Sequence, residues 1–75
     1  MPDDTHNSNT IQITVNAGAR RVPAGSTVND LLASMHLSPQ RVAVEVNRRL
    51  RRAGDYDKPL EEGDAIEIVT FVGGG

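Results

Sequence analysis

The end of the chain offers one reacting group, the α-carboxylate of Gly75. The sequence closes with Phe71-Val72-Gly73-Gly74-Gly75. Ordering glycine costs more backbone entropy than ordering any other residue, so a glycine run adds nothing to a packed core. A backbone without side chains is thin and extensible, which suits it to enter a narrow channel in another protein. We therefore predict that Gly73 and Gly74 form a flexible threading tail and that Gly75 carries the reacting carboxylate.

The other side chains offer little chemistry of their own. The 75 residues include no cysteine, which excludes disulfides, thiol nucleophiles and cysteine-ligated metals. His36 has no second histidine, cysteine or paired acid placed to support a metal site or a base, so we interpret it as a helix-terminal side chain beside the helix dipole. The glycine tail is no phosphate loop, since no helix follows it. We predict no catalytic residue, no metal site and no bound cofactor.

Basic residues are concentrated in one segment. Seven of the eight are arginines, and four stand within five positions, at Arg48, Arg49, Arg51 and Arg52. Such a cluster is typical of phosphate or nucleic-acid sites. The chain, however, has only two aromatic residues for base stacking, and its net charge of −2 gives no bias towards nucleic acid or membranes. We interpret the cluster as a solvated hairpin or a protein-docking patch, with RNA binding as the alternative.

Alternating apolar and polar residues predict the strands. The first begins at Thr10 and the second covers 19–23 as an edge, after an Asn16-Ala17-Gly18 turn in which Gly18 takes a positive φ. Three further strands are expected at 42–46, at 50–52 and at 65–71. Residues 1–9 are polar and lack an apolar period, which indicates a disordered leader.

One helix is expected between the second and third strands. Thr27 is a good N-cap, and Asp30 three residues later can complete a capping box. An apolar stripe follows at helical spacing, formed by Val28, Leu31, Leu32 and Met35. The helix should end near His36, because Pro39 disfavours helical backbone at the residue before it.

This order of elements predicts an α+β fold of the β-grasp, or ubiquitin-like, type. It has a mixed sheet of four to five strands with one main helix across one face, and the last strand lies centrally beside the first. We assign the domain to residues 10–72 and the tail to 73–75. If Ile66 and Ile68 face the core, period two places Val69 and Phe71 on the opposite face. Together with Val72 they would form an exposed apolar patch that docks a partner; a bulge near Thr70 that turns Phe71 inward is the alternative.

Three segments resemble the ThiS family, the sulfur carriers of thiamine biosynthesis: Ala24–Leu32, Val42–Asn47 and Glu62–Gly75. The resemblance extends over about residues 11–75, although the leader is longer than the family's and Leu50-Arg51-Arg52-Ala53 departs from its usual pattern. It implies a carrier and not an enzyme. An adenylyltransferase of the ubiquitin-activating type (ThiF-like) would place a transient AMP on Gly75. A sulfur donor such as a cysteine desulfurase would then convert Gly75 to a thiocarboxylate, and thiazole synthase (ThiG-like) would take the sulfur.

Other functions share the same terminal chemistry. The chain is also compatible with another β-grasp sulfur carrier, such as the small subunit of molybdopterin synthase or a carrier for cysteine biosynthesis. A ubiquitin-like modifier that is conjugated through Gly75 would use the same adenylate. No apolar run reaches the length of a membrane helix and no signal-peptide pattern is present, so we expect a cytoplasmic protein without membrane or nucleic-acid partners.

Overall fold

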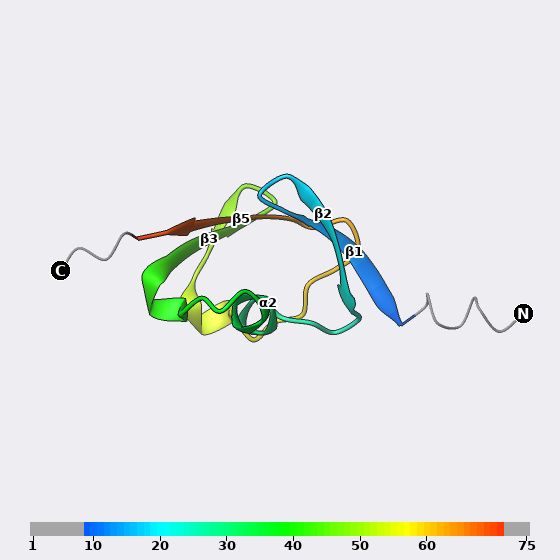
Figure 1. Ribbon diagram of the computed structural model, residues 1–75, viewed down its shortest axis with the longest axis horizontal. Coiled ribbons are helices and arrows are strands. Elements are labelled where there is room, and N and C mark those ends of the chain that lie inside the picture. Colours follow the sequence, from blue (N-terminus) through cyan, green and yellow to red (C-terminus); the bar gives the residue numbers. More distant parts are fainter. Residues whose placement is uncertain (1–8, 72–75) are drawn as a thin grey trace, which may run out of the picture.

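The structure, a computed structural model, describes residues 9–71, in which one α-helix packs on one face of a five-stranded sheet (Figure 1). In chain order the elements are β1 (Thr10–Val15), β2 (Gly18–Pro23), α2 (Val28–Ser34), the 3₁₀ turn η1 (Pro39–Arg41), β3 (Val42–Val46), β4 (Arg49–Arg51), the 3₁₀ turn η2 (Ala53–Asp55) and β5 (Ala65–Thr70). Of the predicted leader only Asn9 is described, and the predicted glycine tail lies outside the described residues.

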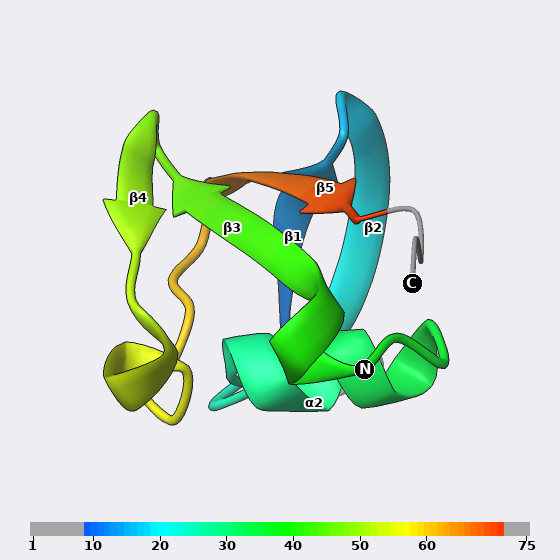
Figure 2. The ribbon, with the colours of Figure 1, turned by 90° about the vertical axis from the view of Figure 1, so that its left-hand side faces the viewer.

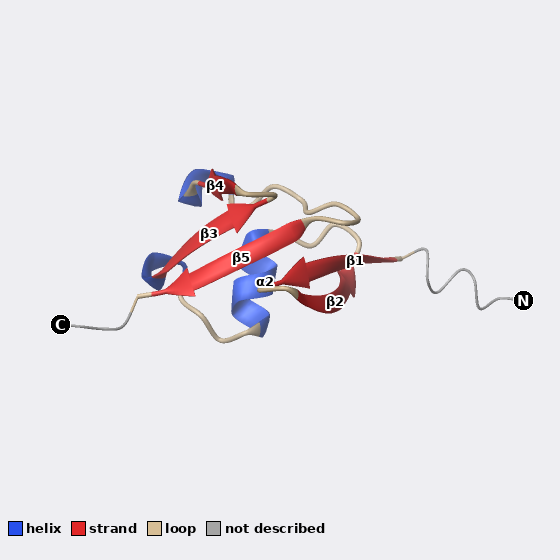
Figure 3. Ribbon diagram, turned by 90° about the horizontal axis from the view of Figure 1, so that it is seen from above, coloured by secondary structure: helices blue, strands red, loops and turns tan. Residues whose placement is uncertain are grey.

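The sheet has the strand order β2-β1-β5-β3-β4 (Figure 3). The last strand lies at its centre, parallel to β1 and antiparallel to β3, with Ile66 opposite Val15 on one side and Ile68 opposite Val44 on the other. β2 is an edge strand, which tolerates Pro23 because an edge backbone needs fewer ladder hydrogen bonds. The predicted β-grasp architecture is therefore confirmed, including the central position of the last strand.

Two tight turns close the two hairpins, and they correct one prediction. Asn16 and Ala17 take φ values of 50° and 72°, and Asn47 and Arg48 take 55° and 71°. Positive φ at both central residues matches the twist of the flanking strands. Gly18 was predicted to take the positive φ, which is wrong: it begins β2, and a Cβ there would lie an ordinary 3.6 Å from the nearest carbonyl oxygen.

The same geometry shifts the fourth strand. It was predicted at 50–52 after a three-residue turn, but β4 covers Arg49–Arg51. Two residues suffice for the turn, so Arg49 already pairs with Val46. Both hairpin turns lie on the side of the sheet away from α2 (Figure 2).

The helix begins at the predicted capping box. The Thr27 hydroxyl oxygen accepts a hydrogen bond from the Asp30 backbone N–H at 3.1 Å, and an Asp30 carboxylate oxygen accepts one from the Thr27 backbone N–H at 3.0 Å. The helix ends at Ser34, and the chain leaves it through His36 at a φ of 60°. Only seven residues are helical, which is too short for an isolated helix to persist. Its stability therefore depends on the cap and on the buried apolar stripe.

We expect Thr27→Ala to lower the free energy of unfolding by about 1 kcal/mol, because the Asp30 backbone N–H loses the hydroxyl oxygen that accepts its hydrogen bond. Urea unfolding followed by circular dichroism measures the change. Ser38→Ala is the matched control, since Ser38 precedes η1 without a side-chain cap bond and should change stability far less. Equal losses in the two variants would contradict a specific role for the capping box.

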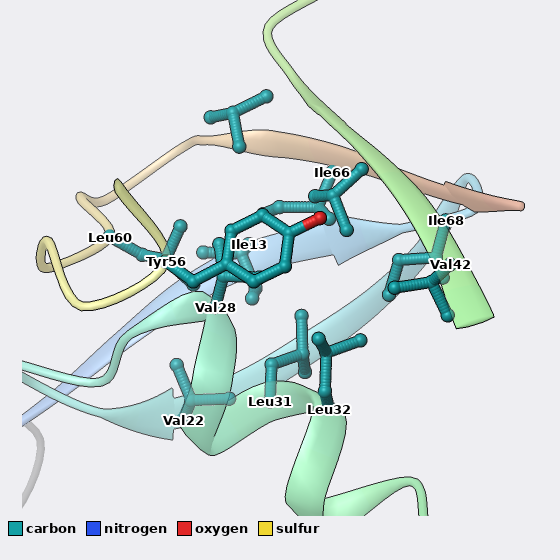
Figure 4. Close-up of a cluster of buried hydrophobic side chains, with 12 residues drawn as sticks. Ile13, Val22, Val28, Leu31, Leu32, Val42, Tyr56, Leu60, Ile66 and Ile68 are labelled. Carbon is teal, nitrogen blue, oxygen red and sulfur yellow. The ribbon is translucent and has the colours of Figure 1, made fainter. Parts of the chain in front are cut away.

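The core lies between α2 and the sheet (Figure 4). Residues from every layer take part, among them Ile13, Val28, Leu31, Leu32, Val44, Ile66 and Ile68. Tyr56 and Leu60 are also buried, although they come from the segment predicted to be irregular. That segment has no apolar period, so the sequence pattern could not reveal that it closes one side of the core.

Candidate functional site

The strand that leads to the glycine tail is tied to both hairpin turns at its start. The Ala65 N–H donates to the side-chain oxygen of Asn47 at 2.9 Å, and the Ile68 N–H donates to that of Asn16 at 2.8 Å. In return, the Asn47 N–H donates to the Ala65 carbonyl at 2.7 Å and the Asn16 N–H to the Ile66 carbonyl at 2.8 Å. Asparagine tolerates the positive φ that both turns require. β5 is therefore held firmly on each side.

The other end of β5 remains paired up to the last described residue. Val69 lies opposite Ala43 and Thr70 opposite Val42, in unbroken register. The Phe71 N–H then donates to the Arg41 carbonyl at 2.8 Å. A bulge at Thr70, the alternative considered above, is absent from this pairing. The side chain of Phe71 accordingly stays on the solvent face.

Exposed apolar side chains gather on the sheet face that α2 does not cover, which we call the open face. Val69 is 61% exposed and Phe71 is 55% exposed, as period two predicts. Leu50 is 68% exposed and was missed by the sequence analysis. It lies opposite Glu45, whose other cross-strand neighbour is Glu67, so it shares this face with Val69 and Phe71. Only the register of the β3–β4 hairpin reveals this.

The β1–β2 half of the open face has a different character. The Arg21 guanidinium donates to the Thr10 hydroxyl at 3.0 Å and to the Gln12 side-chain oxygen at 3.1 Å. Its polar groups thus bond to each other across the two strands. The half formed by β5, β3 and β4 instead carries the exposed apolar side chains Leu50, Val69 and Phe71. Val72 and the three glycines of the predicted site lie outside the described residues.

The remaining surface offers little for catalysis within residues 9–71. No group of three or more His, Cys, Asp or Glu side chains in this range is placed to hold a metal ion. His36 is exposed, at the end of the helix. A hollow of about 660 Å³ is an open depression between β4 and residues 55–64, and charged side chains line its walls. No helix in the described range is long and apolar enough to cross a membrane.

Comparison with known proteins bears directly on this arrangement. The model of the ThiS family matches residues 13–75. The chain is 46% identical over 50 residues to the sulfur carrier protein ThiS of Bacillus subtilis. This match spans 65% of this chain and 76% of that protein. It is 38% identical over 66 residues to a thiazole synthase of Magnetococcus marinus and 33% identical over 66 residues to one of Paramagnetospirillum magneticum. Each match spans 87% of this chain but 20% of the thiazole synthase, so the chain covers about a fifth of those two proteins.

Solved structures give the same result. The crystal structure of the thiamine biosynthesis protein ThiS from Geobacter metallireducens superimposes with a TM-score of 0.69 at 29% identity, over 87% of this chain and 100% of that one. The solution structure of the thiamine biosynthesis protein from the same organism gives a TM-score of 0.68 and covers 88% of that chain. The fold, the exposed strand end and the terminal glycines are thus found together in a chain that matches these carriers.

Proposed function

Because the chain belongs to the ThiS family of sulfur carriers, we propose that it delivers sulfur for the thiazole ring of thiamine as a thiocarboxylate on Gly75. The observation that carries this proposal is the extent of the family match, which runs through residue 75 and so includes the three terminal glycines. In this role the chain is a carrier, a co-substrate of an adenylyltransferase and of a thiazole synthase.

The chemistry requires activation because a carboxylate is a poor electrophile. A Gly75 carboxylate oxygen attacks the α-phosphorus of ATP, pyrophosphate leaves, and an acyl-adenylate forms. A persulfide sulfur then attacks the acyl carbon and AMP leaves. A thiol cleaves the sulfur–sulfur bond of the product and releases the thiocarboxylate. The chain supplies only the carboxylate and its presentation, while a ThiF-like adenylyltransferase and a sulfur donor such as a cysteine desulfurase supply the rest.

The partner proteins dock on the exposed residues at the end of β5. Val69 in β5 and Phe71 directly after it are exposed, and Val72 is the next residue. β5 is paired with β1 at its start and with β3 up to Thr70. Exposed apolar groups of this kind mark interaction sites. A partner that covers Val69, Phe71 and Val72 would hold the start of the tail at the entrance of the partner's channel. Gly73 and Gly74 would then lie inside this narrow channel.

The acceptor is a thiazole synthase. Two proteins of that name contain a segment similar to this chain over 66 residues, and this segment amounts to 20% of their length. A carrier-like segment in the same polypeptide as the synthase supports a direct encounter between the two. We therefore propose a ThiG-like protein as the partner that removes sulfur from Gly75.

The proposal is tested by intact mass. The full chain is incubated with ATP, a ThiF-like adenylyltransferase and sulfide. Its mass should rise by the difference between a sulfur and an oxygen atom, because sulfide displaces AMP from the acyl-adenylate. The Bacillus subtilis carrier is the positive control. An unchanged mass of this chain, in a mixture that converts the control, would contradict the carrier function.

A further inference from the structure

Two acids lie side by side on the open face of the sheet. In the β3–β5 pairing Glu45 is directly opposite Glu67, and both side chains are exposed. The Cβ atoms of such a pair are about 5 Å apart, and like charges placed this way destabilise a sheet. Among residues 9–71 neither carboxylate forms an ion pair or accepts a hydrogen bond. The pair therefore does not serve the fold.

Exposed apolar side chains flank the two acids. Leu50 lies opposite Glu45 on β4, so Leu50, Glu45 and Glu67 form a row across three strands, which we call the acidic row. One step further along the same face Val69 lies opposite Ala43. The helix α2 is on the other side of the sheet and covers none of these side chains (Figure 2).

The acidic row is continuous with the proposed docking residues at the end of β5. Phe71 is four residues beyond Glu67, which corresponds to about 13 Å along an extended strand. A specific protein interface buries roughly 800 Å² on each partner, so it extends well beyond that distance. A partner that covers Val69 and Phe71 therefore also covers the acidic row.

The arginines of the β3–β4 hairpin do not neutralise the row. Arg49 and Arg51 lie opposite Val46 and Val44, whose side chains are buried beneath the sheet, so both arginines are on the side of α2. The other two arginines of the cluster form no ion pair with any residue of the described range. The positive charge that would balance the two acids is thus left to a partner.

The chemistry of that partner follows from what its approach would bury. Carboxylates that lose water without gaining a counter-charge are costly to bury, and contacts to neighbouring apolar side chains do not offset the cost. A basic residue on the partner removes it: the planar fork of arginine bonds carboxylate oxygens in pairs, and lysine supplies a point charge. Because Leu50 and Val69 flank the acids, apolar side chains around that basic residue complete the fit.

We propose that the open face binds a surface of the adenylyltransferase on which an arginine or lysine, surrounded by apolar side chains, lies between Glu45 and Glu67. The identity of this partner rests on the proposed function. In the two matched thiazole synthases the carrier-like segment belongs to the same polypeptide as the synthase, so those proteins need not capture it from solution. An adenylyltransferase that captures a free carrier gains most from opposite charge, which raises the rate of association.

Matched double variants of the full chain test the role of the acids. Binding to the ThiF-like adenylyltransferase of the same genome is measured by biolayer interferometry at low and high salt. The double variant Glu45→Gln, Glu67→Gln should bind about tenfold more weakly at low salt and lose most of the salt dependence. Its thermal midpoint should rise by about 2 °C, because the repulsion within the pair is removed.

The control removes the same charge elsewhere. Glu61 and Glu62 are exposed in the turn before β5, and glutamine at 62 can still accept the hydrogen bond from the Gln12 N–H. Glu61→Gln, Glu62→Gln should therefore leave binding nearly unchanged. Glu67→Lys should weaken binding more than Glu67→Gln, because two cations would then meet in the interface.

Three outcomes would overturn the inference. An equal loss of affinity in the control would assign the effect to net charge. Wild-type affinity in Glu67→Lys would show that the acids only keep the open face soluble. ATP–pyrophosphate exchange on the wild-type chain is measured alongside. If wild type supports exchange while its binding is independent of the two acids, only the acidic-row proposal falls; if it supports none, the proposed function fails at its first step and this inference fails with it.

Discussion

Deletion of Gly75 should abolish adenylation of the chain and leave its fold intact. The deletion draws the terminal carboxylate back by about 3.3–3.6 Å along an extended backbone. Attack on the α-phosphorus of ATP needs close alignment, and a misplacement of about 1 Å can already lower a rate about a hundredfold. In the truncated chain the terminal carboxylate, now on Gly74, therefore does not reach the α-phosphorus that it must attack.

ATP–pyrophosphate exchange with the adenylyltransferase measures this step alone, before any sulfur is involved. Circular dichroism of the same sample reports the fold, which should not change because the described core lies within residues 13–68. Gly74→Phe is a companion variant that keeps the chain length but adds a bulky side chain to the tail. We expect it to block exchange as well, because the side chain would not fit a channel shaped for bare backbone. Exchange at the wild-type rate after deletion of Gly75 would show that this carboxylate is not the reacting group.

Much of the fold could be predicted from local patterns. Ile11, Ile13 and Val15 alternate because one face of their strand is buried, and the capping box marks the start of α2 directly. Tyr56 and Leu60 could not be assigned to the core, since their burial depends on how an aperiodic segment packs beside the start of α2. The Gly18 prediction failed because glycine was taken as the residue that needs a positive φ, whereas asparagine and alanine adopt it in this turn.

The candidate site could also be predicted from the sequence only in part. The buried positions of Ile66 and Ile68 determine which way Val69 and Phe71 point, so period two is enough to predict their exposure. Leu50 depends on a different kind of information. Its face is set by where a two-residue turn places a three-residue edge strand, and a shift of one residue reverses the face. The sequence analysis placed that strand one residue late and therefore did not find Leu50.

The last expected result separates docking from folding at the end of β5. Phe71→Ala should weaken binding of the chain to the adenylyltransferase and to the thiazole synthase by about thirtyfold, the loss typical of a residue at the centre of an interface. Its effect on the free energy of unfolding should be about 0.5 kcal/mol, because the ring is 55% exposed. Isothermal titration calorimetry and urea unfolding measure the two quantities.

Ile66→Ala is the matched control on the same strand, because Ile66 has 0% exposure and faces α2. Its loss should lower the free energy of unfolding by about 2–5 kcal/mol, through lost burial and the cavity left behind. For a domain of this size such a loss is a large share of the total stability. We therefore expect Phe71→Ala to lower partner affinity with little loss of stability, and Ile66→Ala to lower chiefly the free energy of unfolding. A large fall in stability for Phe71→Ala, with partner affinity unchanged, would show that the ring belongs to the core and that the partner docks elsewhere.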